Sequence, residues 1–381
     1  MLDQLAQRAR GVRQSDIRAV TRRIEARGGV NLGQGTCALP TDPRVLDAAH
    51  RALNAGKNSY TLFDGIPALR AAVAARYGTY NALQIEPENV LVTGGATGAF
   101  ECVCKAFLEP GDRVVLVEPV YGYHLRQVVE RAAVPSYVRL HAPEWTLDMA
   151  ELEAELAKGP KLLVFSNPNN PSGKVFTRAE LTAIGELCRA YGVIAVVDEV
   201  YEYIMGEGAE HVSLASLPGM FEHTLTLSSA SKTLFVTGWR VGWLVGPADV
   251  LQPLGVKSDE TYVCAPSPFQ HAVAEAYAGD DAFFRSIRTP FQAKAGRLAD
   301  ALRGAGFKPQ VPMGAYYMLA DYRGLGHASD AAAMGALVDG VGIGSIPGSA
   351  FYLDGADTGM LRFCFAVVDA ELDRACELLA A

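Results

Sequence analysis

KLLVFS at residues 161–166 and VIAVV at residues 193–197 are two short apolar runs, with a turn-rich loop and a helical pattern between them. Four more runs of this kind occur at residues 90–93, 114–118, 224–228 and 241–245. Apolar, β-branched runs that alternate with helical patterns are typical of parallel strands buried between helices. Residues 45–285 are therefore predicted to form a parallel sheet that helices cover on both faces.

The segments that flank this region predict a second and smaller domain. Residues 1–44 contain a polar helical pattern, a short strand-like piece and a turn bounded by prolines, which suits an arm. Residues 286–381 begin with a predicted helix (roughly 285–304), which strand-like pieces around 315–320, 342–346 and 360–366 and a closing helix from 369 follow. The predicted fold class is α/β, with a large sheet domain and a smaller α+β domain that the arm completes.

Composition narrows the classes of function. The chain has 381 residues, more than one compact core accommodates, and its formal net charge of −8 disfavours a nucleic-acid-binding surface. Its longest apolar stretches have the length of strands, whereas a membrane-spanning helix needs about 20 apolar residues. Residues 1–13 lack the apolar core of a signal peptide. We expect a cytoplasmic enzyme with neither a nucleic-acid nor a membrane partner.

The seven cysteines are scattered along the chain and odd in number. Cys102 and Cys104 form the only close pair, and on a helix they would point to different faces, which disfavours metal binding. We expect reduced, mostly buried thiols and no metal site.

Polar and small residues follow the predicted strands at the edge where an open parallel sheet binds its ligands. After residues 90–93 come Gly94, Gly95, Ala96, Thr97 and Gly98, and a helical pattern begins at once. Small residues and a hydroxyl at a helix N-terminus suit an anion such as a phosphate. An ordinary strand–helix turn is the alternative reading.

Two more strand ends carry groups that suit a flat polar ligand. Tyr121 follows the run at 114–118, where its ring is placed to stack on a heteroaromatic ring or to fill the core. The loop NPNNPSG at residues 167–173 follows the run at 161–166, and its two prolines hold an amide side chain rigidly at the sheet edge.

The remaining two strand ends carry charges. Asp198 directly follows five apolar residues, so its carboxylate needs a partner unless the strand end is solvated. Lys232 follows the run at 224–228, where desolvation and nearby cations would make its amine nucleophilic toward an aldehyde. Pyridoxal 5′-phosphate requires the groups that these five strand ends offer together: an anion-binding turn, an aromatic ring for stacking, a fixed amide, a carboxylate and a lysine.

The sequence also resembles a known family, the fold-type I, class I/II aminotransferases, which include the aspartate, aromatic and kynurenine/glutamine aminotransferases. The resemblance covers nearly the whole chain and follows the family order. It implies the aspartate aminotransferase-like fold, in which the large domain has a mostly parallel sheet of seven-stranded type. It rests on Tyr60 and on NLGQG at 31–35, GIPALR at 65–70, GAT at 95–97, NPNNPSG at 167–173, DEVY at 198–201, SASK at 229–232, GWR at 238–240 and LRF at 361–363. The SASK…GWR and NPNNPSG segments are the specific signals.

The resemblance implies a role for each matching residue. Lys232 would form an aldimine with pyridoxal 5′-phosphate and move the proton between the substrate and the cofactor. Asp198 would pair with the pyridine nitrogen, while Tyr201 and Asn170 would hydrogen-bond the phenolic oxygen. Tyr121 would stack on the ring, and the phosphate would be held by Gly95, Ala96, Thr97, Ser229, Arg240 and Tyr60.

The resemblance further implies a homodimer with shared active sites, in which Tyr60 reaches across from the partner subunit. Arg362 would hold the α-carboxylate of the substrate, with Gly35 and Asn170 close to that substrate. The reaction implied is amino-group transfer from an L-amino acid to a 2-oxo acid.

Two departures from the family pattern bear on the substrate. The segment TCALP at residues 36–40 lacks the Pro-x-Phe pattern of the kynurenine/glutamine branch, and Thr97 stands where one bacterial aspartate branch has lysine. A neutral, aromatic or sulfur-containing amino acid is therefore favoured over aspartate. The sequence leaves two alternatives open: a C–S lyase that performs β-elimination on the same fold, and a non-catalytic domain of this fold.

Overall fold

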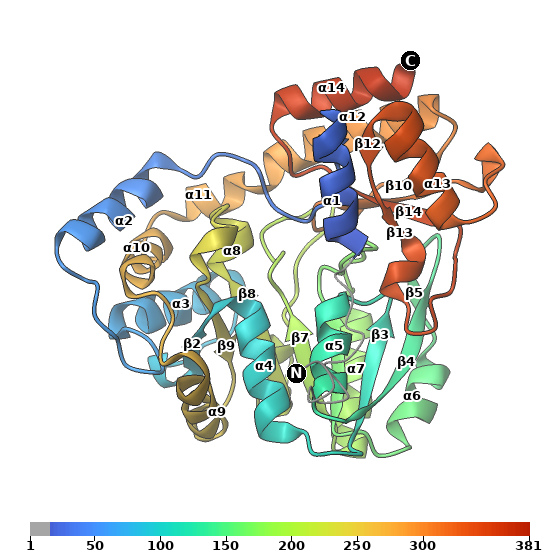
Figure 1. The fold of residues 1–381 in the computed structure, drawn as a ribbon. Coiled ribbons are helices and arrows are strands. Elements are labelled where there is room, and N and C mark those ends of the chain that lie inside the picture. The colour runs from blue at the N-terminus through green and yellow to red at the C-terminus, as the bar shows by residue number, and fades with distance from the viewer. Residues whose placement is uncertain (1–15) are drawn as a thin grey trace, which may run out of the picture. The chain divides into compact units, whose positions relative to one another are not determined.

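The structure is a computed structural model that describes residues 16–381 (Figure 1). Residues 1–13, which were predicted not to form a signal peptide, lie outside the described residues. The backbone contacts divide the chain into two units. The larger unit comprises Cys37–Ala293 and Pro312–Tyr316, and the smaller one comprises the described residues up to Thr36 together with Lys294–Val311 and Tyr317–Ala381. The predicted domain boundaries, near residues 44 and 285, stay a prediction.

The larger unit is built on a sheet of mostly parallel strands, as predicted. Its order is β2-β9-β8-β7-β6-β3-β4-β5, eight strands where a seven-stranded type was expected. The strands are β2 (Val90–Thr93), β3 (Arg113–Glu118), β4 (Val134–His141), β5 (Thr146–Leu147), β6 (Leu162–Ser166), β7 (Ile194–Asp198), β8 (Thr224–Ser229) and β9 (Gly242–Val245).

Strand β9 differs from the prediction in its direction. It pairs antiparallel with both β8 and β2. Only residues 230–241 separate β9 from β8, and the one α-helix among them, α8 (Ala230–Thr233), is too short for the usual crossover between parallel strands. Because β9 is the only reversed strand between them, β2 and β8 still run in the same direction.

Helices cover this sheet on both faces. The chain crosses the sheet toward β4 through α4 (Gly95–Phe107) and α5 (Gly122–Glu130), and it returns toward β7 through α6 (Met149–Leu156) and α7 (Arg178–Tyr191). Because each crossover is right-handed, the first two helices lie on one face of the sheet and the other two lie on the opposite face. Helices α4 and α5 contact each other, and so do α6 and α7 (Figure 1). The strand order thus reverses between β3 and β6, and ligands bind at such a point.

Additional helices complete the larger unit, and α10 packs on both α2 and α3. They are α2 (Pro43–Asn54), α3 (Pro67–Tyr80), α9 (Ala248–Tyr262), α10 (Ser267–Tyr277) and α11 (Asp281–Ser286), with short 3-10 turns η3 (Pro87–Asn89), η4 (Leu214–Ser216), η5 (Phe221–His223) and η6 (Thr237–Trp239).

Local sequence explains the element that leads into β7. Helix α7 begins at a capping box, in which the Thr177 hydroxyl accepts from the Glu180 amide and the Glu180 carboxylate accepts from the Thr177 amide. It ends at Gly192, whose φ of 66° suits glycine. The buried run of β7 follows and delivers Asp198 to the sheet edge.

The smaller unit contains a four-stranded antiparallel sheet of order β10-β11-β14-β13 and a parallel pair, β1 with β12. Its strands are β1 (Val30–Asn31), β10 (Lys308–Gln310), β11 (Tyr317–Asp321), β12 (Ile343–Gly344), β13 (Ile346–Pro347) and β14 (Met360–Cys364). Its helical segments are α1 (Asp16–Arg27), α13 (Asp330–Ala336), α14 (Asp369–Ala380), η7 (Arg323–Leu325), η8 (Leu337–Val341), η9 (Gly348–Phe351) and most of α12 (Arg288–Gly304).

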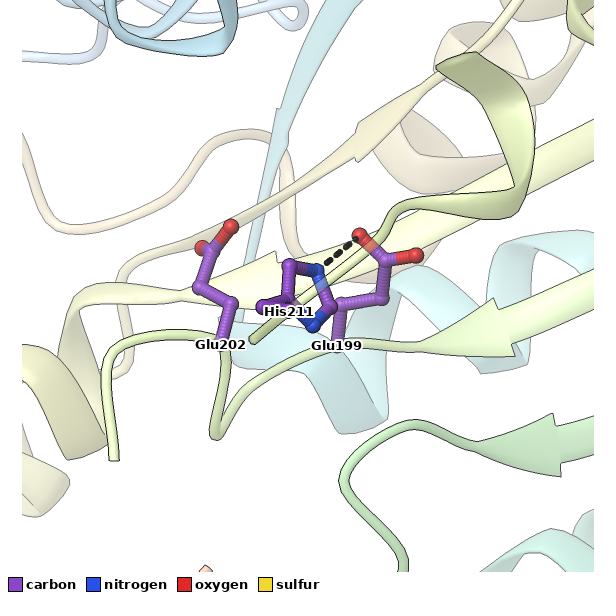
Figure 2. A group of neighbouring side chains, drawn as sticks. All are labelled: Glu199, Glu202 and His211. Carbon is purple, nitrogen blue, oxygen red and sulfur yellow. Dashed lines mark hydrogen bonds and ion pairs between the residues drawn. The ribbon is translucent and has the colours of Figure 1, made fainter. Parts of the chain in front are cut away.

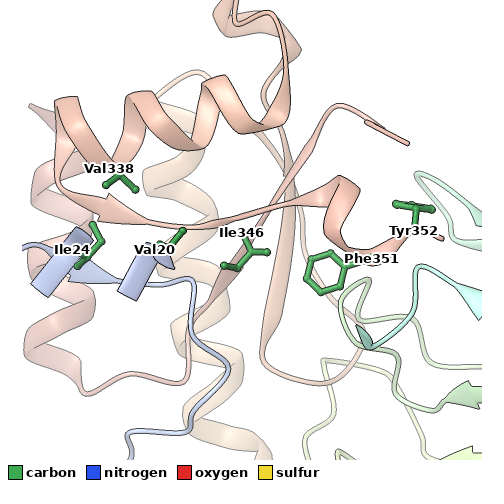
Figure 3. Packing of buried hydrophobic residues seen from close by; sticks show 6 residues of the cluster. All are labelled: Val20, Ile24, Val338, Ile346, Phe351 and Tyr352. Atoms are coloured by element: carbon green, nitrogen blue, oxygen red, sulfur yellow. The ribbon is translucent and has the colours of Figure 1, made fainter. Parts of the chain in front are cut away.

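The N-terminal arm is packed into this smaller unit. Val20 and Ile24 of α1 lie in one apolar cluster with four residues from the C-terminal part of the chain (Figure 3). Those residues are Val338, Ile346, Phe351 and Tyr352. Among the residues that the structure describes, no helix combines the length and the apolar composition needed to span a membrane.

Candidate active site

The predicted ligand-binding edge exists in the larger unit. Strands β2, β8, β7, β6 and β3 all end at the same edge, because they run in one direction. At that edge Gly242 of β9 pairs with Thr93 on one side and with Ser229 on the other. This register brings the turn after β2 next to the turn that carries Lys232.

Arg240 joins these two turns. Its guanidinium donates to the Gly94 carbonyl at 3.3 Å and approaches the Ser231 hydroxyl at 3.5 Å. Gly95 has a φ of 77°, and a Cβ at this position would overlap the guanidinium of Arg240. The helix α4 begins at Gly95, so its first amides lie beside a fixed cation, which suits an anionic group such as a phosphate. Ala96 and Thr97 occupy the same first turn.

Asp198 is the buried carboxylate of the site, with 6% of its surface exposed. One of its oxygens lies 3.2 Å from Nε2 of His124, and the other accepts from the Val200 amide at 3.3 Å. These two contacts fix the carboxylate in place, with His124 as the partner that a buried charge requires. His124, which is itself buried on α5, was not among the predicted site residues.

Tyr121 lies next to this pair. Its ring meets the ring of His124 edge-on, with the centroids 5.4 Å apart. Asn169 connects the loops after β3 and β6, since its amide donates to the Pro119 carbonyl at 3.3 Å. Asn170 is buried, with 4% exposed. The ends of β3, β6 and β7, at and next to the switch point of the sheet, therefore carry an aromatic ring, a rigid amide loop and a fixed carboxylate.

Lys232 is half-buried on α8 and lies against aromatic rings. Its Nζ is 6.0 Å from the ring centroid of Tyr201 and 5.5 Å from that of Tyr316. The two rings pack edge to face at 5.1 Å. An aromatic face attracts an ammonium group, so these two rings help to orient the amine. Tyr316 was not among the predicted site residues either.

In the smaller unit, Arg362 is a buried cation with 2% exposed. Its guanidinium lies 4.3 Å from the ring of Tyr317 and 4.9 Å from that of Phe351, and it donates to the Gly33 carbonyl at 2.6 Å. The Tyr317 hydroxyl also contacts Gly35, where a Cβ would overlap it. The predicted substrate residues Gly35 and Arg362 therefore share one neighbour.

Tyr60 is a predicted phosphate-binding residue whose side chain is exposed. It belongs to the larger unit, and 81% of its surface is exposed. Within residues 16–381 it forms neither a hydrogen bond nor a ring contact.

Residues 27–379 match the family model "Aminotransferase class I and II". The chain belongs to this family. It is a transaminase, and members of the family use pyridoxal 5′-phosphate.

Proteins named for different substrates are similar to this chain in sequence and fold. Kynurenine–oxoglutarate transaminase 3 of Mus musculus is 34% identical over 386 residues, which cover 92% of this chain and 84% of that protein. The structure of N-succinyldiaminopimelate aminotransferase from Mycobacterium tuberculosis superposes with a TM-score of 0.95 at 34% identity, covering 99% of both chains. Aspartate aminotransferase from Thermus thermophilus with maleate gives 0.91 at 30% identity, covering 99% of this chain and 98% of that one. The predicted fold class and transaminase activity are confirmed.

Proposed function

We propose that this transaminase holds pyridoxal 5′-phosphate at the carboxyl edge of its large sheet. The cofactor would supply an aldehyde that accepts an amino group and a ring that withdraws electrons from the bond being broken. The main support is the buried carboxylate of Asp198, which His124 and the Val200 amide hold in place. Asp198 ends β7, and β7 pairs with β8, the strand that leads to Lys232. A carboxylate held in this way would keep the ring nitrogen of the bound cofactor protonated.

The remaining contacts fit the same cofactor. Arg240, Ser229 and the first turn of α4 (Gly95, Ala96 and Thr97) would hold the phosphate, because a Cβ at residue 95 would occupy that cradle. Tyr121 would stack on the ring, and Tyr201 and Asn170 would donate to its phenolic oxygen. Lys232 would bind the cofactor covalently and then carry the proton between the two reacting carbons.

The substrate proposed is a neutral, aromatic or sulfur-containing L-amino acid with a 2-oxo acid as acceptor. Three relatives act on, or are named for, kynurenine, N-succinyldiaminopimelate and aspartate. Because Thr97 replaces the lysine of one aspartate branch, we expect aspartate to be a poor donor. A panel of amino acids assayed with pyruvate and with 2-oxoglutarate measures this. A kcat/KM for aspartate above those of all neutral, aromatic and sulfur-containing donors would contradict the assignment.

Arg362 is proposed to bind the α-carboxylate of every substrate. Its planar guanidinium is held between Tyr317 and Phe351, and a lysine does not reproduce two parallel charge-assisted hydrogen bonds. We expect Arg362→Lys to raise KM for each amino acid and 2-oxo acid, with a loss of about 2–4 kcal/mol in kcat/KM.

The matched control is Arg303→Lys on the exposed surface of α12, which should leave both constants unchanged. Cofactor affinity, measured by titration of the apoprotein, should be the same in both variants. A loss of cofactor rather than of substrate affinity in Arg362→Lys would refute the role.

The assembly proposed is a cytoplasmic homodimer with shared active sites. The support is Tyr60, a large aromatic side chain left exposed although the family pattern assigns it to the phosphate. In a dimer it would reach the phosphate of the partner subunit.

A further inference from the structure

Three titratable side chains are buried together behind the sheet edge of the larger unit: Glu199, Glu202 and His211 (Figure 2). Their exposed fractions are 0%, 1% and 8%. Nε2 of His211 lies 3.3 Å from an oxygen of Glu199. Glu202 accepts from the Ser228 hydroxyl at 2.8 Å and from the Asn81 amide at 3.4 Å.

The charges of this group do not balance when both carboxylates are ionised. One imidazolium and two carboxylates leave a net charge of −1, and an uncompensated buried charge is strongly unfavourable. The other titratable groups that face these three side chains are phenols on the surrounding elements, namely Tyr77, Tyr80, Tyr203 and Tyr277. The charged groups behind these phenols are either ion-paired, as Arg76 is with Asp281, or exposed, as Arg288 and Glu210 are. Retaining one more proton makes the group neutral.

Among these three side chains, Glu202 is the one on which the electrostatics favour the additional proton. Burial, together with the charge of Glu199, raises the pKa of Glu202 to about 7, although His211 and the Ser228 hydroxyl act against it. Burial alone would lower the pKa of His211, but the charge and the hydrogen bond of Glu199 outweigh it and raise this pKa. The neutral arrangement is an ion pair between His211 and Glu199 beside an uncharged Glu202.

This group connects the strand ends that carry the proposed site. Glu199 directly follows Asp198, and its amide donates to the Leu227 carbonyl of β8 at 2.8 Å. The Glu202 side chain is bound to Ser228, one residue before Ser229. The residue after His211, Val212, accepts from the Asn167 amide at 3.0 Å, which anchors the loop after β6.

We propose that Glu199, His211 and Glu202 act as one positioning unit, which shares two protons in its neutral form and holds the turn at residues 198–202 against the ends of β6 and β8. Removing one proton leaves a buried negative charge and loosens this turn. Asp198 then loses its fixed position. The three are positioning residues, because they act on a ligand only through Asp198.

A divalent metal ion is the competing occupant, since one ligand atom from each residue lies within 4.8 Å of the others. The hydrogen bonds favour protons over a metal. Nε2 of His211 faces Glu199, and both Glu202 oxygens already accept hydrogen bonds. Metal content is therefore one arm of the test.

The test is the pH dependence of unfolding of the cofactor-free protein, compared with Glu202→Gln, which keeps the shape of a neutral carboxylic acid. A pKa raised in the folded state means that folding binds the proton more tightly. Stability is then fully present below the ordinary pKa of 4.5 and is lost as the pH rises toward 7. We expect the unfolding constant of the wild type to rise by about a hundredfold more than that of Glu202→Gln between pH 5 and 8.

A matched control and a second readout complete the experiment. Glu207→Gln, an exposed glutamate in the same segment, should keep the wild-type profile. The infrared carbonyl band of a protonated carboxylic acid should persist in the wild type at pH 6, vanish near pH 8 and be missing from Glu202→Gln. Identical pH profiles in wild type and Glu202→Gln, or a wild type without that band at pH 6, would overturn the proposal. So would a stoichiometric metal ion, found by mass spectrometry, that Glu202→Gln lacks.

The link to Asp198 rests on the proposed function and has its own readout. Pyridoxal 5′-phosphate affinity, followed by protein fluorescence, should weaken above pH 7 in the wild type more than in Glu202→Gln. Equal weakening in both would refute the link. Failure to bind the cofactor at any pH would instead refute the proposed function, while the unfolding result still decides on the proton.

Discussion

Replacing Lys232 by alanine is expected to lower kcat by about four to six orders of magnitude, because one side chain then fails both to bind the cofactor and to move the proton. The site offers a specific reason for this dependence. Tyr201 and Tyr316 orient the amine at the end of β8. The measurement is kcat with saturating pyridoxal 5′-phosphate, together with borohydride treatment, which should fix the cofactor to the wild type but not to the variant.

Lys257→Ala serves as the control, because Lys257 is an exposed lysine on α9 paired with Glu260. It should retain wild-type kcat and the borohydride product. Both variants should unfold at similar denaturant concentrations. Near wild-type turnover in Lys232→Ala would refute the proposed chemistry.

The second large effect is expected at Asp198. Asp198→Asn keeps the shape of the side chain but removes the charge that holds a ring nitrogen protonated, so kcat should fall by about three to four orders of magnitude. His124→Asn should lower kcat less, since the Val200 amide still holds one carboxylate oxygen. Asp259→Asn on the exposed surface of α9 is the matched control. A kcat for Asp198→Asn within tenfold of the wild type would mean that the acid partner lies elsewhere.

The sequence predicted the large sheet well because its strands are buried on both faces. Runs such as Ile194–Asp198 are apolar throughout and end at a charged residue, so strand and strand end are visible together. Strand β4 (Val134–His141) was missed, because it is half-exposed near the edge of the sheet and mixes Pro135, Ser136 and Arg139 with apolar residues. The direction of β9 was wrong, although the short connection after β8 was a signal for antiparallel pairing.

Residues that act through a neighbour were harder to find than residues at strand ends. His124 is a single histidine on an amphipathic helix, and its contact with Asp198 depends on how α5 packs. Glu202 and His211 lie nine positions apart around a loop, and no local pattern shows that their side chains meet. Long-range packing decides such contacts.

We expect the amino group of the substrate to be transferred to the cofactor at this sheet edge. The most direct test is a single half-reaction, in which cofactor-loaded protein is mixed with an amino acid donor and no 2-oxo acid acceptor. We predict one equivalent of 2-oxo acid per subunit, with the amino group retained as pyridoxamine 5′-phosphate and no release of ammonia. Continued formation of 2-oxo acid together with ammonia would mean that the enzyme eliminates the amino group instead of transferring it.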